Sequence, residues 1–267
     1  MLKLRVVTAL ILLPLVLALV FYAPLWLFRG VTAVLLIVGA WEWTMLAGYI
    51  SWRTRLLLLL GFGLLLASVH VLPRLLPYPQ DIILLCSIGL VWWTFSFFWV
   101  AVWRTEFPRP LKVICGLLTL LPAAAAFIAV RRMGPDLLLG LFILVWAADI
   151  GAYFTGKAIG RHKLAPQVSP GKTWEGLAGG MLVSGLAATA GCLWLPVPAL
   201  PFIFICIAVS LISVVGDLSE SLFKRQAGVK DSGTLFPGHG GLLDRVDSLT
   251  AAAPAFWLGM YLLGVAL

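Results

Sequence analysis

Long apolar stretches separated by short polar connections account for most of the chain. An α-helix needs about 20 mainly apolar residues to cross the hydrocarbon core of a bilayer, and about nine stretches have that length. The pattern therefore predicts an all-α, polytopic membrane protein with about nine transmembrane helices, whose cytoplasmic polar loops form the active site. The predicted spans are residues 1–22, 24–47, 56–72, 82–103, 111–130, 137–154, 176–195, 199–223 and 246–265.

The composition supports this prediction. Hydrophobic residues make up 62% of the chain, charged residues 11%, and the mean hydropathy is +1.05. Ordinary soluble domains carry about 25% charged residues. Residues 1–267 are predicted to form a single membrane domain, because neither an internal repeat nor a Ser/Pro-rich linker is evident. The cysteines lie in apolar runs without a CxxC pair, which is typical of buried structural thiols.

The formal net charge of +8 indicates topology rather than nucleic-acid binding. No Lys/Arg-rich run is interleaved with aromatic residues, so we expect no nucleic-acid partner. If the N-terminus is cytoplasmic, the positive-inside rule is obeyed, because few of the 19 Lys and Arg residues remain outside. Those outer residues are Arg29, Arg74, Arg131 and Arg132. The first apolar run lacks a small-residue cleavage motif, so we expect a retained span and not a signal peptide.

A dense polar block at residues 217–248 interrupts the apolar pattern. Its acidic residues are Asp217, Glu220, Asp231, Asp244 and Asp247. Asp217, Glu220 and Lys224 share one helix face at positions i, i+3 and i+7, and Asp244 and Asp247 share a face of the next helix. Mg²⁺ commonly takes one or two protein carboxylates, with waters and substrate phosphates completing its shell. Carboxylates from two facing helices therefore predict a Mg²⁺ site.

The alternative is that these carboxylates form structural ion pairs with the cations of the same block. Those cations are Lys224, Arg225, Lys230 and Arg245. A single pair fits this alternative as well as it fits a functional role. The whole set favours function, because many charges held beside lipid contribute little net stability. The Gly-rich turn at 237–241 also exposes bare backbone that can approach a ligand closely.

A second polar loop, residues 147–176, precedes the predicted seventh span. Asp149 lies near the end of an apolar helix on the same face as Tyr153, and we expect it to point inward at a partner. The segment Ser169-Pro-Gly-Lys-Thr173 is not a P-loop, because Pro166 occupies the first glycine position and the preceding segment is helical. It is a Gly-rich, cationic turn before a helix, where free N–H groups and the helix dipole favour phosphate.

Glu42 lies between Trp41 and Trp43, near the end of the predicted second span. Tryptophans are enriched at membrane interfaces, so an interfacial carboxylate that reaches water is one interpretation. A functional carboxylate is the other, because acidic residues within membrane segments often mark sites. The sequence leaves both open.

Four segments of the polar block carry a family resemblance. They are Ser221-Leu-Phe-Lys-Arg225, Lys230-Asp-Ser-Gly233, Phe236-Pro-Gly-His-Gly-Gly241 and Asp244-Arg-Val-Asp247. Together they resemble the signature of the phosphatidate cytidylyltransferases, also called CDP-diacylglycerol synthases, with every fixed position filled and the spacing intact. The loop from Asp149 to Glu175 and the surroundings of Glu42 are also similar to this family, so the likeness covers essentially the whole chain.

The resemblance implies a reaction in which CTP and phosphatidate give CDP-diacylglycerol and pyrophosphate. It further implies a requirement for Mg²⁺, with a second, monovalent, cation left open. The protein would be a homodimer in a bacterial-type inner membrane, with its N-terminus and active site on the cytoplasmic side and its lipid entering from the bilayer.

The site residues follow from this resemblance. It favours Asp217 and Asp244 as Mg²⁺ ligands. The expected catalytic residues are these two together with Asp247 and Lys224. Asp247 and Glu220 are expected to be additional ligands or to support the ligands. The phosphates of CTP and lipid are expected to contact Lys172, Thr173, Lys224, Arg225, Lys230, His239, Gly240, Gly241 and Arg245. His239 either donates to a phosphate or caps the glycine turn.

Rival classes predict other features. A cation-coupled transporter would concentrate carboxylates near the bilayer midplane, whereas these lie at predicted helix ends. A CDP-alcohol phosphotransferase would carry a DGxxAR run, which is absent. A purely structural scaffold would leave the polar block unexplained.

Overall fold

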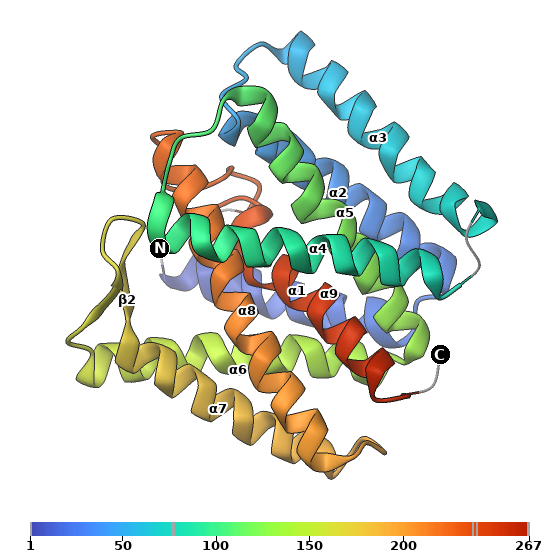
Figure 1. Cartoon of the computed structure of the whole chain (residues 1–267), viewed down its shortest axis with the longest axis vertical. Helices are drawn as coiled ribbons and strands as arrows, with labels where there is room; N and C mark the ends of the chain where they lie inside the picture. The colour runs from blue at the N-terminus through green and yellow to red at the C-terminus, as the bar shows by residue number, and fades with distance from the viewer. Residues whose placement is uncertain (1, 76–77, 237, 239, 266–267) are drawn as a thin grey trace.

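The computed structural model describes the backbone of residues 2–75, 78–236, 238 and 240–265, and their side chains except those of 2–9 and 66–75. In this part of the chain, nine α-helices and a two-stranded sheet pack into a helical bundle (Figure 1). The helices are α1 (Leu2–Phe21), α2 (Leu25–Leu46), α3 (Trp52–Leu75), α4 (Gln80–Phe98), α5 (Arg109–Met133), α6 (Pro135–Ile159), α7 (Trp174–Cys192), α8 (Ala199–Gln226) and α9 (Leu243–Leu262).

Several of these helices identify an integral membrane protein. Among the described residues, α2, α5, α6, α8 and the joined α4 and η1 (Trp99–Trp103) are long and apolar enough to cross a bilayer. Each predicted span corresponds to one helix, with ends that differ by several residues. The all-α prediction is confirmed for the helical bundle, while the number of helices that cross the membrane stays a prediction.

Helix α9 lies at the centre of the bundle and not at its periphery (Figure 1). Every residue from Ser248 to Trp257 is buried, and α9 packs against α4, α5, α6 and α8. A helix that is apolar all round belongs to the interior of a large protein. Because Ala251, Ala252 and Ala253 are small, the neighbouring helices can approach α9 from several sides.

Glycines bring α6 and α7 into close contact. A Cβ atom at Gly151 would lie 2.8 Å from the carbonyl oxygen of Gly179, and one at Gly180 would lie 2.7 Å from that of Ala148. Small residues let membrane helices approach closely, so backbone packs on backbone along this pair. The two helices thereby form one wall of the candidate site.

The connection between α6 and α7 contains an antiparallel hairpin, β1 (Lys163–Ala165) and β2 (Ser169–Thr173). The sequence predicted only a cationic turn here, because Pro170 and Gly171 both disfavour a strand. In this two-stranded sheet β2 is an edge strand. Proline is tolerated on an edge strand, because its missing N–H group need not break a hydrogen bond between strands. Thr173 ends β2 and caps α7, its hydroxyl oxygen accepting the N–H of Gly176 at 3.0 Å.

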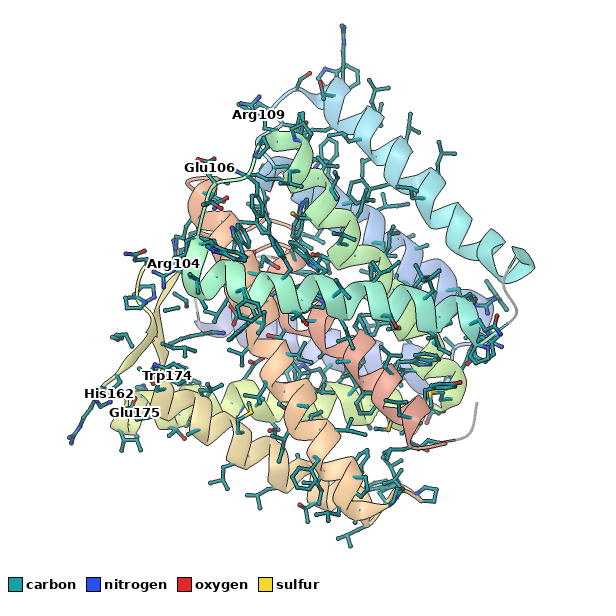
Figure 2. All side chains as sticks on the ribbon, in the orientation of Figure 1. Arg104, Glu106, Arg109, His162, Trp174 and Glu175 are labelled. Carbon is teal, nitrogen blue, oxygen red and sulfur yellow. The ribbon has the colours of Figure 1, made fainter. Side chains whose placement is uncertain are left out.

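The polar connections gather at one side of the bundle. Figure 2 labels Arg104, Glu106, Arg109, His162, Trp174 and Glu175 along that side. The guanidinium of Arg104 donates to the side-chain oxygen of Gln167 at 2.9 Å, joining the η1–α5 connection to the hairpin. The guanidinium of Arg225 donates to the carbonyl oxygen of Val168 at 3.3 Å, joining the end of α8 to the same hairpin.

Candidate active site

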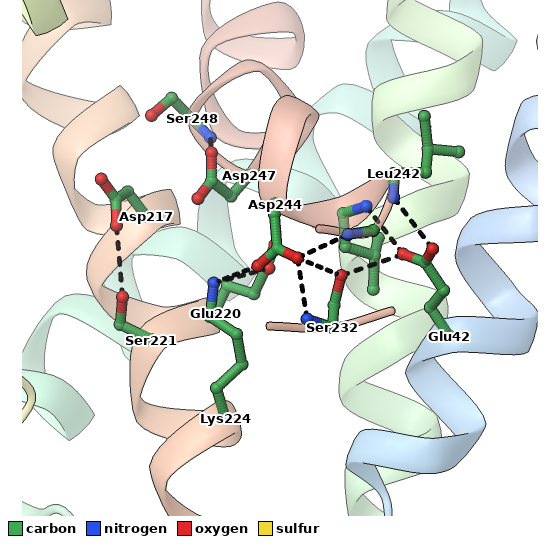
Figure 3. A network of polar contacts seen from close by, with 12 residues as sticks. Glu42, Asp217, Glu220, Ser221, Lys224, Ser232, Leu242, Asp244, Asp247 and Ser248 are labelled. Atoms are coloured by element: carbon green, nitrogen blue, oxygen red, sulfur yellow. Dashed lines mark hydrogen bonds and ion pairs between the residues drawn. The ribbon is translucent and has the colours of Figure 1, made fainter. Parts of the chain in front are cut away.

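Helices α8 and α9 approach each other closely where the carboxylates lie. A Cβ atom at Gly216 would lie 2.6 Å from the carbonyl oxygen of Asp247, so only glycine permits this approach. Figure 3 shows Asp217 on α8 beside Asp247 on α9. The carboxylates of Asp217, Glu220 and Asp247 are close enough to repel one another electrostatically. The structure thus brings together carboxylates from the ends of α8 and α9.

These residues belong to a larger set that we call the carboxylate network. It consists of Glu42, Asp217, Glu220, Lys224, Ser232, Asp244 and Asp247 (Figure 3). The ammonium group of Lys224 occupies its centre, 2.7 Å from Asp244 Oδ1 and 3.1 Å from Glu220 Oε1. The lysine thus compensates two carboxylates that are each nearly inaccessible to solvent.

Asp244 is held at both of its oxygens. While Oδ1 faces Lys224, Oδ2 accepts the backbone N–H groups of Ser232 and Gly241, both at 2.8 Å. Partial burial raises the pKa of Asp244, but the Lys224 ammonium and the Gly241 and Ser232 N–H groups outweigh it, so the pKa lies below its usual value. Asp244 is therefore ionised at neutral pH.

Asp217 connects the network to a cavity of about 450 Å³ between α6, α7, α8 and the hairpin. Its Oδ2 atom lies 2.6 Å from the ammonium nitrogen of Lys172 on β2. Asp149 and Tyr153 line the cavity from α6, and both residues are exposed, so the expectation that Asp149 is turned inward onto a partner stays a prediction. Glycines, including Gly171 and others of α6 and α7, form much of the remaining wall, which leaves backbone accessible to a ligand.

An apolar groove of about 490 Å³ adjoins this cavity. Leu164, Leu177 and Val214 belong to the walls of both. The rest of the groove is formed mainly by aromatic and aliphatic side chains of α4, α7 and α8, such as Trp93 and Leu218. Polar cavity and apolar groove are thus neighbours across a shared wall.

The structure brings only some of the predicted phosphate-binding residues to the network or the cavity. Lys172, Lys224, Gly240 and Gly241 lie there, whereas Arg225, Lys230 and Arg245 are exposed. Thr173 lines the cavity, although its hydroxyl is used to cap α7. His239 lies outside the described residues.

Glu42 is the main residue whose place the sequence left undecided. Its side chain is buried and belongs to the network, so the interpretation as a water-exposed interfacial carboxylate is wrong. Its hydrogen-bond partners lie 190 to 201 residues further along the chain. No local pattern could have revealed them.

The described part of the network has the charge expected of a divalent-cation site. Glu42, Asp217, Glu220, Asp244 and Asp247 contribute five negative charges when ionised, and Lys224 together with Lys172 of the cavity wall contributes two positive charges, which leaves three negative charges. No three His, Cys, Asp or Glu side chains among the described residues are grouped so as to hold a metal by themselves. Mg²⁺ needs only one or two protein carboxylates when water and phosphate complete its shell, so the residues present fit it.

A bundle of apolar helices that holds an acidic, lysine-containing site beside an apolar groove defines a membrane-embedded protein built to meet both charged and apolar groups. The chain belongs to the cytidylyltransferase family, whose sequence profile matches residues 3–263. The resemblance noted in the sequence is thereby confirmed, and the chain is a transferase.

Curated relatives agree with this assignment. The phosphatidate cytidylyltransferase of Pseudomonas aeruginosa is 41% identical over 272 residues, covering 96% of each chain. That of Haemophilus influenzae is 38% identical over 281 residues, covering 96% of this chain and 97% of the relative. The Bacillus subtilis protein of the same name is 43% identical over 133 residues, about half of each chain.

Proposed function

We propose that the chain transfers the cytidylyl group of CTP to phosphatidate, giving CDP-diacylglycerol and pyrophosphate in phospholipid biosynthesis. Family membership and two relatives similar over nearly their whole length support this reaction. The observation that carries the proposal is the position of Asp217. It belongs both to the carboxylate network and to a cavity that adjoins an apolar groove, so a nucleotide and a lipid headgroup can meet beside it.

The reaction needs charge compensation more than a strong base. An oxygen of the phosphatidate phosphate attacks the α-phosphorus of CTP, and the bond from that phosphorus to the β-phosphate bridge oxygen breaks, releasing pyrophosphate. A phosphate monoester has a second pKa near 6, so the attacking group is largely a dianion at neutral pH. Two anionic substrates must then approach each other, and the leaving charge must be neutralised.

Lysines of the site are placed to reduce this repulsion. Lys172 lies on the cavity wall and Lys224 at the centre of the network, and each is paired with a carboxylate that would share it with an arriving phosphate. We propose that Asp217 and Asp244 hold Mg²⁺, with Asp247 and Glu220 beside them. When bound, Mg²⁺ would supply Lewis-acid stabilisation of the charge that develops on the phosphates.

The cavity and the groove divide the substrates by polarity. We propose that CTP enters the polar cavity between α6, α7 and the hairpin, where Gly171 and neighbouring glycines let backbone approach phosphate. The acyl chains of phosphatidate would lie along the groove past Trp93 and Leu218, and the shared wall would place the headgroup beside Asp217. The exposed cations Arg225, Lys230 and Arg245 would attract anionic substrates at the rim.

We also propose an inner-membrane location with the N-terminus and the polar side in the cytoplasm, and a homodimeric state. The distribution of Lys and Arg supports the orientation. The dimer rests on the family resemblance alone.

One assay tests the reaction. Purified protein in detergent is incubated with phosphatidate, Mg²⁺ and CTP labelled at the α-phosphorus, and the organic phase is counted. Label is expected there with α-labelled CTP, and not with γ-labelled CTP or when phosphatidate is omitted. If no label reached the organic phase under conditions in which another phosphatidate cytidylyltransferase is active, the proposal would be wrong. Transport of a solute into proteoliposomes without consumption of CTP would favour the transporter class instead.

A further inference from the structure

Glu42 has a carboxylate buried within the protein, and no cation among the described residues forms an ion pair with it. Its side chain is 5% exposed, and no Lys or Arg among the described residues lies within ion-pair distance of it. A buried charge is costly unless hydrogen bonds satisfy it. Three donors do so here: the backbone N–H of Leu242 on Oε1, and the backbone N–H of Leu243 and the hydroxyl of Ser232 on Oε2, at 2.9, 2.9 and 3.0 Å.

Two of these donors belong to the start of α9. Leu242 and Leu243 are the N-cap and the first residue of the helix, and a leucine side chain cannot accept the free N–H groups found there. Glu42 accepts them from α2 and also places a negative charge at the positive end of the helix dipole. The cap of α9 is therefore supplied by a residue 200 positions earlier in the chain.

The third donor leads from Glu42 to Asp244. The hydroxyl of Ser232 lies 3.0 Å from Glu42 Oε2 and 3.0 Å from Asp244 Oδ2, so it bridges the two carboxylates (Figure 3). The loop residues Gly233 and Gly241 pack closely against Glu42. A Cβ atom at Gly233 would lie 2.6 Å from Glu42 Oε1, and one at Gly241 would lie 2.6 Å from both of its oxygens.

We propose that Glu42 is a positioning residue for Asp244. It fixes the first turn of α9 and the loop carrying Ser232, and so holds Asp244 toward Lys224 and across from Asp217. It touches neither substrate nor the reacting atoms. This inference rests on the proposed function insofar as Asp244 binds the metal ion of the reaction.

The variant Glu42→Gln tests the proposal because it keeps the shape of the side chain. A carboxylate offers two acceptor oxygens, whereas an amide offers one, so one of the Leu242 and Leu243 N–H groups must face an NH₂ group whichever way the amide turns. The protein should still fold, but α9 should begin out of position. Asp136→Asn is the control, because Asp136 is an exposed carboxylate at the start of α6 and is not part of the network.

The decisive measurement is the Mg²⁺ concentration for half-maximal activity. Support for a metal-bound residue typically contributes about 10- to 100-fold to metal affinity or activity. We expect Glu42→Gln to raise the half-maximal Mg²⁺ concentration by about 10-fold or more, to lower kcat, and to leave the KM for phosphatidate unchanged. Asp136→Asn should behave as wild type. A Glu42→Gln protein of reduced melting temperature but unchanged Mg²⁺ dependence would overturn the proposal, since that is the result of a merely structural role.

A second readout does not depend on activity. Hydrogen exchange should increase in residues 240–247 of Glu42→Gln and stay unchanged in α7, and unchanged exchange at 240–247 would contradict the proposal. If wild type itself transferred no label, the proposed function would be wrong, and hydrogen exchange would still decide whether Glu42 holds α9.

A second variant is available if Glu42→Gln is not recovered folded. Ser232→Ala removes only the bridging hydroxyl and should raise the half-maximal Mg²⁺ concentration about fivefold, as loss of one hydrogen bond would. An unchanged Mg²⁺ dependence in Ser232→Ala would also contradict the proposal.

Discussion

Lys224 joins two carboxylates from different parts of the chain, Glu220 one turn earlier on α8 and Asp244 on α9. The first pair could be predicted from the sequence, because an i, i+4 spacing places both side chains on one helix face. The second could not, because only the packing of α8 against α9 brings Asp244 to the lysine. The same holds for Lys172 and Asp217, whose ion pair joins a strand to a helix end.

Removal of the Lys224 ammonium should destabilise the protein strongly. Lys224→Met leaves two poorly accessible carboxylates without their partner, and breaking a buried pair from one side typically costs about 3 to 5 kcal/mol. The free energy of unfolding in mixed micelles measures the loss. Lys163→Met, at an exposed position of the hairpin, is the control and should stay within about 0.5 kcal/mol of wild type. Equal stability of the two variants would show that Lys224 does not compensate the network.

At the scale of elements, the sequence predicts the helices well and the hairpin poorly. Apolar stretches near 20 residues long correspond to helices because length and hydropathy are local properties. The β1–β2 hairpin depends on pairing between Lys163 and Thr173 and between Ala165 and Ser169, in segments too short and too rich in Gly and Pro to show an alternating pattern. Its position against α8, through Arg225, is likewise a tertiary contact.

The contact between α8 and α9 should be sensitive to the size of residue 216. Gly216→Val places a side chain against the carbonyl oxygen of Asp247, which forces the helices apart at the site. Overpacking of this kind costs about 1 to 3 kcal/mol, and kcat should fall because Asp217 moves away from Asp247. Gly140→Val in α6 is the control, because a Cβ atom there would have no neighbour within 4 Å. Wild-type activity in Gly216→Val would contradict the close approach.

The junction between the hairpin and α7 should weaken in acid. Hydrogen bonds from its own backbone N–H and from the imidazole of His162 outweigh the opposing effect of burial and, with the N–H groups of Arg161 and His162, lower the pKa of Glu175 to about 2. Because this pKa lies below the ordinary value of 4.5, the contribution to stability is complete above about pH 4.5 and is lost as the pH falls toward 2.

The melting temperatures of wild type and Glu175→Gln measure this contribution. Their difference should be constant from pH 7 to about 4.5 and should shrink as the pH falls further, since protonated Glu175 resembles glutamine. A difference that persists unchanged at the lowest pH at which both proteins remain folded would rule out the ionised carboxylate as its cause.

At the scale of the whole molecule, the site depends on contributions from distant segments. Glu42 of α2, the β1–β2 hairpin and the ends of α8 and α9 meet at one side of the bundle (Figures 1 and 3). The motif between residues 217 and 248 identifies the acidic residues, because it lies in one continuous stretch. It does not identify Glu42 or the apolar groove, since both arise only when helices from across the chain pack together.

Labelling from one side of the membrane tests the proposed orientation. Lys163 in the hairpin and Trp194 beyond the other end of α7 are both exposed, and α7 separates them. In a Cys192→Ser background, a membrane-impermeant maleimide added to intact spheroplasts should label Trp194→Cys and not Lys163→Cys. The opposite result would place the polar side of the bundle outside the cytoplasm.

The central claim is that carboxylates at the facing ends of α8 and α9 promote cytidylyl transfer to a lipid. Its most direct test is the transfer of α-phosphorus label from CTP to phosphatidate by purified wild type, Asp217→Asn and Asp244→Asn, beside Asp136→Asn as an exposed control at the start of α6. Wild type and Asp136→Asn should label the lipid at similar rates, while the other two variants, folded and of normal size, should lose about 100-fold or more in kcat. Near-normal transfer by folded Asp217→Asn or Asp244→Asn would contradict the account.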